Sequence, residues 1–175
     1  MNLMKITLRR SWKMKINKDI VIKRFEKLDA ILKELKTARK IGKREFLSNF
    51  SKQMIVHRAL VLSVNICIDI GTHIIAYNNK KTPETYSKIF QILKELNIIP
   101  ERMEKKLIEM VGLRNLLGHL YMEIDNEIIY DIIQKEISIF SEFKKRIISN
   151  FADQLLHSDW DTTIHIFQKS FYYII

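Results

Sequence analysis

Apolar residues recur about every three to four positions along most of this chain, which is the period of an amphipathic helix. The first such pattern follows Asn17, a residue suited to cap a helix, and predicts a helix at about 18–40. A second pattern runs from about Arg44 to Ile75 without a proline and predicts one long helix. Its middle, residues 59–70, is apolar almost all round, so this helix should be central and well buried.

The third and fourth predicted helices are both marked by a proline near their start. Thr82 and Pro83 have the character of an N-cap followed by a first helical residue, and they predict a short helix at about 84–96. Pro100 opens a further pattern that continues through Leu117. Gly118 then weakens the helical pattern, so the continuation of the fourth helix is left open.

A fifth helix is predicted at about 126–149, after Asp125 as its N-cap. Five helices with short links form an antiparallel bundle. The composition agrees with this all-α fold class, because four glycines and two prolines supply little turn chemistry for a β fold. The sequence therefore predicts an all-α, antiparallel bundle of about five helices with one core.

The chain divides into a bundle domain at 17–150 and two short extensions. The extension at 1–16 is basic and lacks the apolar stretch of a signal peptide, and no uninterrupted apolar window is long enough to span a bilayer. The extension at 151–175 is rich in apolar residues without a clear period. It could pack on the bundle, form a strand or bind another chain. Packing or an oligomer contact is favoured over a dedicated functional role.

The net charge of +10 at pH 7 favours polyanionic partners, such as nucleic acid or an anionic membrane surface. The alternative is that surface lysines only keep a helical protein hydrated. The sole cysteine, Cys67, cannot form an internal disulfide, which fits a reducing compartment. Together with the absence of a signal peptide, this predicts a cytoplasmic protein that does not enter a membrane.

The strongest chemical signal lies at residues 112–121, GLRNLLGHLY, and includes Arg114, Asn115, His119 and Tyr121. On an ideal helix Asn115 and His119 share a face, whereas Arg114 and His119 lie about 140° apart. One straight helix therefore cannot aim both side chains at the same phosphate. Either Gly118 lets the backbone leave the helix before His119, or the same motif from a second subunit completes the site.

These residue types match the needs of RNA cleavage without a metal. An imidazole such as His119 can remove the proton of a ribose 2′-OH or protonate the departing 5′-oxygen at neutral pH. The guanidinium of Arg114 can hold the phosphorane oxygens as charge develops, while Asn115 orients either group or binds a phosphate oxygen. A structural alternative is that Arg114 pairs with Glu109 or Glu123 and that His119 is an ordinary interface residue.

Asp69 and His73 form a second polar pair, four positions apart on the predicted long helix. They could line the cleft or bind a metal, but no third ligand stands at a suitable spacing, so a structural hydrogen bond is the favoured interpretation. We predict no metal and no cofactor. A Gly-rich phosphate loop, a CxxC pair and a Gly-x-Ser-x-Gly elbow are all absent from the sequence.

The chain resembles the HEPN ribonucleases of the HepT toxin family. The HepT motif Arg-Asn-x3-His-x-Tyr is matched by Arg114, Asn115, His119 and Tyr121, and the similarity covers about 17–150. Further similarity lies in Ala59-Leu60, in Ile68-Asp69-Ile70 with His73, and in the Pro83-x-x-Tyr86 turn. Gly118 departs from the family pattern, which often has an apolar residue there, and the two extensions lie outside it.

The resemblance implies a homodimer with a composite cleft, within a larger hetero-oligomer or alone. It implies a metal-independent endoribonuclease toxin of a type VII-like HEPN/MNT system, which cleaves tRNA or mRNA to 2′,3′-cyclic phosphate ends. It also implies a minimal nucleotidyltransferase antitoxin that silences the enzyme by AMPylation of Tyr121. The alternative function is a catalytically silent helical module that binds a nucleotidyltransferase partner or nucleic acid.

Overall fold

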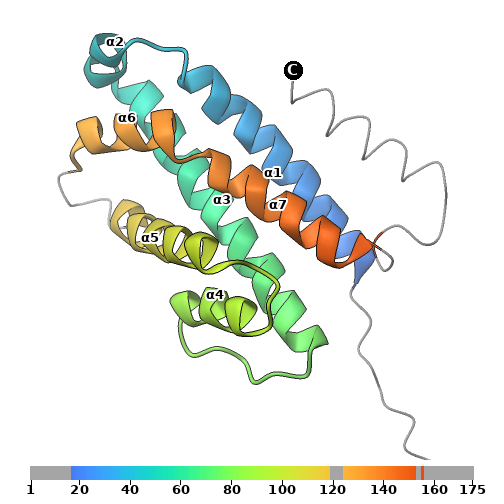
Figure 1. Ribbon diagram of the computed structural model, residues 1–175. Coiled ribbons are helices and arrows are strands. Elements are labelled where there is room, and N and C mark those ends of the chain that lie inside the picture. The colour runs from blue at the N-terminus through green and yellow to red at the C-terminus, as the bar shows by residue number, and fades with distance from the viewer. Residues whose placement is uncertain (1–16, 119–123, 153–154, 156–175) are drawn as a thin grey trace, which may run out of the picture.

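The computed structural model describes residues 17–118, 124–152 and 155, and within these residues all regular secondary structure is α-helical (Figure 1). The seven helices are α1 (Lys18–Ala38), α2 (Lys43–Ser48), α3 (Phe50–Tyr77), α4 (Tyr86–Glu95), α5 (Glu101–Gly118), α6 (Asn126–Lys135) and α7 (Ser138–Asn150). The predicted all-α bundle is therefore confirmed. Two of the five predicted helices, however, are each divided in two.

Helix α3 lies at the centre of the bundle (Figure 1). It packs against α1 and α7 on one side and against α4 and α5 on the other, while α2 and α6 meet at one end of the molecule. Its buried side chains include Leu60, Ile70 and Ile74, none of which exposes more than 1% of its surface. The prediction that this helix is central and buried is correct.

The predicted long helix is broken at Asn49, so the prediction of a continuous helix from Arg44 is wrong. Asn49 has extended backbone angles, φ −118° and ψ 95°, and its side chain caps α3 by accepting from the N–H of Lys52. The Gln53 amide fixes the corner by donating to the carbonyls of Phe46 and Leu47. A cap and a buried side chain thus outweigh the helical period of the sequence here.

The predicted fifth helix is also divided, at Glu136 and Ile137, between α6 and α7. Ile137 and Ile139 are both buried, although residues two apart would point about 200° away from each other on a straight helix. The turn between the two helices resolves this conflict, because it lets both side chains enter the core. The predicted cap at Asp125 is confirmed, since its side chain accepts from the N–H of Glu127 at 2.8 Å.

Helix α4 begins two residues later than predicted, with Thr85 as its N-cap in place of Thr82. The hydroxyl of Thr85 accepts from the N–H of Lys88 at 3.2 Å. The helix then lies very close to α3 at Gly71, where an added Cβ would stand 2.5 Å from Cγ2 of Ile89. This close approach sets the position of Tyr86, the first residue of α4.

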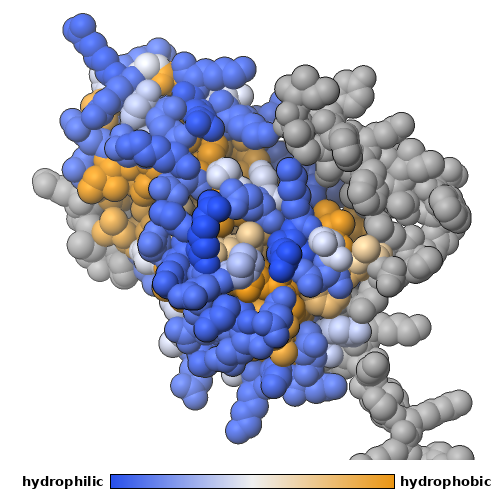
Figure 2. All heavy atoms as spheres, in the orientation of Figure 1, coloured by the Kyte–Doolittle hydropathy of each residue, from blue (hydrophilic) through white to orange (hydrophobic). Residues whose placement is uncertain are grey.

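By length and composition alone, α3 is the one described helix that could cross a membrane. In this fold, 61% of its most apolar window is buried inside the protein, so a place in the core accounts for its composition. The visible surface around the bundle is mostly hydrophilic, with hydrophobic areas between the polar residues (Figure 2).

The start of the C-terminal extension packs on the bundle. Phe151 is buried, and its ring makes an edge contact with Tyr77 at a centroid distance of 6.1 Å. Leu155 is buried as well, and its N–H donates to the carbonyl of Phe151. The prediction for the remainder of 151–175, and that for 1–16, lies largely outside the described residues.

Candidate active site

Arg114 lies one turn before the described end of α5 and is held by three neighbours. Its Nε donates to Oδ1 of Asn65 on α3 at 2.9 Å, and its Nη1 donates to Oδ1 of Asn115 at 3.1 Å. Its Cζ lies 4.9 Å from the ring centroid of Tyr86, at the start of α4. Helices α3, α4 and α5 therefore meet at this guanidinium.

The packing of α5 explains why these polar groups reach the surface. Leu107, Met110, Val111 and Leu117 are buried against the bundle, and this places Arg114 half-buried at the edge of the core and Asn115 in solvent. Asn65 is half-buried on α3, within reach of the arginine. The arginine side chain is consequently ordered by packing as well as by hydrogen bonds.

The neighbours of Arg114 orient it without neutralising it. Two amide oxygens and one aromatic ring carry no net charge, and no acidic residue among those described pairs with this guanidinium. Glu109, one of the two acids considered as a structural partner, instead binds Lys106 at 3.1 Å. The arginine thus keeps its positive charge available for an anion, and no described residue accepts a hydrogen bond from Nη2.

The remaining predicted motif residues, His119 and Tyr121, lie outside the described residues, as does Glu123. Helix α5 is regular up to Gly118, the last described residue before that gap. The structure therefore brings together Arg114 and Asn115 from the motif. The positions of the imidazole and of the motif tyrosine remain predictions.

Asp69 and His73 both join α3 to α1. Oδ2 of Asp69 accepts from Nε of Arg24 and pairs with its Nη2, both at 3.2 Å, and Nε2 of His73 accepts from the backbone N–H of Asn17 at 2.9 Å. Burial, and then the nearby charge of Arg24, lower the pKa of His73, which favours the neutral ring that such an acceptor requires. No group of three or more His, Cys, Asp or Glu in the described part of the chain could hold a metal ion.

Sequence reasoning missed the two side chains that hold Arg114 from other helices. Asn65 is an amide within the apolar run VLSVNICIDI, a position where a polar side chain needs a partner. The single amide in an apolar run indicates that Asn65 has a polar partner, but it does not identify Arg114 as that partner. The sequence marks Tyr86 only as part of the Pro83-x-x-Tyr86 turn that it shares with the family. Its contact with Arg114 depends on how α4 packs on α5, which the sequence does not show.

Residues 19–147 match the protein family described as HepT-like, Ribonuclease HepT-like. An mRNA nuclease HepT of Shewanella oneidensis is 28% identical over 125 residues, 71% of this chain and 93% of the relative. A tRNA nuclease HepT of Aphanizomenon flos-aquae is 28% identical over 130 residues, 74% of this chain and 88% of the relative.

The fold is similar to that of solved toxin structures. A tri-AMPylated HEPN toxin of Shewanella oneidensis in complex with an MNT antitoxin is 27% identical, with a TM-score of 0.70. The similarity covers 75% of this chain and 98% of that toxin chain. Sequence and fold thus agree on the same relatives.

Proposed function

Because this chain belongs to the HepT-like ribonuclease family, we propose that it is a toxin that cleaves RNA with Arg114, Asn115 and His119. The observation that carries this proposal is the uncompensated guanidinium of Arg114, fixed by Asn65 and Tyr86 beside Asn115. A fixed, charged fork of this kind suits the phosphorane oxygens of a cleaving phosphodiester. Such a site needs neither a metal nor a cofactor.

The reaction is a transesterification within the RNA strand. A base removes the proton of the ribose 2′-OH, the 2′-oxygen bonds to phosphorus, and the bond from phosphorus to the 5′-oxygen breaks. The departing oxygen takes a proton, which leaves a 2′,3′-cyclic phosphate and a 5′-OH. His119 serves as base or acid, Arg114 binds the charged oxygens, and Asn115 orients the arginine.

We further propose that the active unit is a homodimer with a composite cleft. Arg114 and His119 diverge by about 140° on a straight helix, so a second motif across a two-fold axis would supply the missing group. Leu116, next to Asn115, leaves 38% of its surface exposed and offers apolar area for such a contact. The dimer can act alone or within a hetero-oligomer with an antitoxin.

The proposed partner is a minimal nucleotidyltransferase antitoxin that AMPylates Tyr121. The tyrosine hydroxyl gives up its proton to a base and its oxygen bonds to the α-phosphorus of ATP. The bond from this phosphorus to the bridging oxygen breaks, and pyrophosphate leaves with its electrons. Support comes from the 27%-identical toxin, whose structure is described as tri-AMPylated and in complex with an MNT antitoxin. An AMP group close to the motif would add negative charge and bulk where the RNA phosphate has to bind.

Incubation of the purified protein with tRNA and with mRNA in EDTA, followed by end-group analysis, tests the nuclease. We expect cyclic phosphate ends from the wild type, and none from Arg114→Ala or His119→Ala variants that keep the wild-type oligomeric state. Retained cleavage in both variants would refute the proposed site. Salt-sensitive RNA binding without cyclic ends would instead favour the catalytically silent binding module.

Mass spectrometry of the intact protein tests the modification. With the antitoxin and ATP, we expect the wild type to gain AMP groups and to lose cleavage activity, whereas Tyr121→Phe should gain none and stay active. AMP labelling of the Tyr121→Phe variant at the wild-type level would show that another residue is the acceptor.

A further inference from the structure

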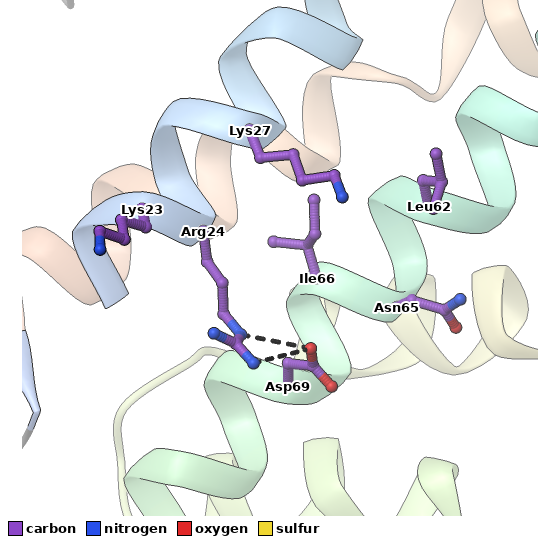
Figure 3. Close-up of a pocket in the computed structure, with 7 residues that line it drawn as sticks. All are labelled: Lys23, Arg24, Lys27, Leu62, Asn65, Ile66 and Asp69. Atoms are coloured by element: carbon purple, nitrogen blue, oxygen red, sulfur yellow. Dashed lines mark hydrogen bonds and ion pairs between the residues drawn. The ribbon is translucent and has the colours of Figure 1, made fainter. Parts of the chain in front are cut away.

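A surface groove of about 320 Å³ lies between α1 and α3, and it shares Asn65 with the candidate active site (Figure 3). Helix α1 contributes Lys23, Arg24 and Lys27, and α3 contributes Asn65, Asp69 and two aliphatic side chains. Lys27 extends across the groove toward α3, and Arg24 reaches down to Asp69 (Figure 3). The groove therefore has basic residues on α1 and a carboxylate on α3, while the Lys23 ammonium points outward from α1 and the Asn65 amide points away from α1 (Figure 3).

The charges in this groove do not balance. Asp69 binds Arg24 through Nε and Nη2, both at 3.2 Å from Oδ2, so the carboxylate is already used by one cation. Lys23 and Lys27 are exposed, and no described residue forms an ion pair with either ammonium group. Two unpaired lysines beside a hollow attract a ligand with regularly spaced negative charges.

Asn65 is shared by the groove and the candidate active site. This residue lines the groove, and its Oδ1 also accepts the hydrogen bond from Nε of Arg114 at 2.9 Å. The basic residues of α1 and the guanidinium of Arg114 thus lie on either side of the segment of α3 that carries Asn65. An RNA strand whose reacting phosphate lies at Arg114 would meet these lysines as it leaves the site.

We propose that the groove between α1 and α3 binds the RNA backbone at a phosphate outside the cleavage site, through Lys23 and Lys27. This inference rests on the proposed ribonuclease function. Lysine contacts to phosphates fix the position of a strand and carry no base information, so the groove contributes affinity without sequence preference. A second copy of this chain is a poor occupant, because two-fold pairing of the groove with itself would bring like charges together.

The experiment measures binding of a fluorescent single-stranded 2′-deoxy oligonucleotide, which has the phosphates of RNA but no 2′-OH to react. We expect Lys23→Ala/Lys27→Ala to weaken binding about tenfold at moderate salt, equally for different base sequences. A plot of the logarithm of the binding constant against the logarithm of the salt concentration has a negative slope. The magnitude of this slope should fall by about 0.7 for each lysine removed, the value for a phosphate contact to a single strand. The matched control is Lys33→Ala/Lys145→Ala, which removes two exposed lysines outside the groove and should bind like the wild type.

Equal binding by the groove variant and the wild type would overturn the proposal. If the groove variant binds the oligonucleotide normally but no longer co-purifies with the antitoxin, the groove is a protein-docking surface, and the proposal is likewise wrong. A wrong proposal of the ribonuclease function would give a different result from a wrong proposal of the groove. In the former case the wild type would bind the oligonucleotide through these lysines but would produce no cyclic phosphate ends from RNA.

Discussion

Arg114 and Asn65 are joined by a hydrogen bond of 2.9 Å between the guanidinium Nε and the amide Oδ1. This bond connects α5 to the central helix α3 across 49 positions of sequence. It ties the orientation of the motif arginine to the most buried element of the bundle. Asn65 is therefore a positioning residue in the proposed site, and its removal is the most direct test of that role.

Substitution of Asn65 by alanine should lower kcat for RNA cleavage about tenfold to a hundredfold. A hydrogen bond to a charged group contributes about 1.5–3 kcal/mol, and its loss lets the guanidinium rotate away from the phosphate. Steady-state cleavage kinetics measure the effect, with little change expected in KM or in the unfolding temperature. The control Thr72→Ala removes a hydroxyl that bonds only the Ile68 carbonyl on the same helix, and should retain wild-type kcat. Wild-type kcat in Asn65→Ala would contradict the positioning role.

Tyr86 supports Arg114 through its ring, so the ring and the hydroxyl can be separated by substitution. Tyr86→Phe keeps the aromatic face that lies 4.9 Å from Cζ and should cleave within about twofold of the wild type. Tyr86→Leu loses the face and should cleave about two- to fivefold more slowly, because an exposed cation–π contact contributes about 0.5–1 kcal/mol. Equal rates for the two variants would show that the ring does not act on the arginine.

The features that the sequence predicts well are those decided by neighbours in the chain. Asn17 and Asp125 cap their helices as expected, because a cap depends on backbone N–H groups two or three residues away. The start and the described extent of α5 also follow from Pro100 and from the apolar period after it. Local chemistry is sufficient for such elements.

The features that the sequence does not predict depend on side-chain contacts that the helical period does not reveal. The break at Asn49 leaves Phe46 buried and Phe50 73% exposed, although one helical period includes both. Its causes are the Asn49 side chain, which caps α3, and the Gln53 amide, which bonds the end of α2. The role of Asn65 was hidden for a similar reason, since periodicity places it on α3 but does not say that α5 brings an arginine there.

His57 links stability to pH. It is 8% exposed, and its Nε2 lies 2.8 Å from Oδ1 of Asn126, which joins α3 to α6. Burial lowers the pKa of His57 below the ordinary value of about 6.5. The unfolded chain therefore binds a proton at this residue more tightly than the folded protein does. The free energy of unfolding should therefore fall as the pH decreases below about 6.5 towards the lowered pKa.

Urea unfolding of the wild type and of His57→Gln between neutral and mildly acidic pH measures this contribution. Glutamine keeps an amide donor but has no group that titrates, so the variant should lose less stability on acidification. If the free energies of unfolding of the two proteins change in parallel over this pH range, groups other than His57 cause the pH dependence.

Two glycines within helices should respond in opposite directions to alanine. At Gly71 the new Cβ would stand 2.5 Å from Cγ2 of the buried Ile89, so α4 would have to move away from α3. We expect Gly71→Ala to destabilise the protein by about 1–3 kcal/mol, as overpacked cores do. At Gly112 nothing lies within 4 Å, and alanine should stabilise α5 by about 0.5–1 kcal/mol through its higher helix propensity.

Urea unfolding of the two variants measures these changes, and cleavage kinetics of Gly71→Ala extend the test to the site. Movement of α4 would shift Tyr86 away from Arg114, so the variant should also lose part of its kcat, by no more than Tyr86→Leu loses. A Gly71→Ala protein with wild-type stability would show that α4 can adjust at little cost. The close approach at Gly71 would then no longer explain how the ring is held against the arginine.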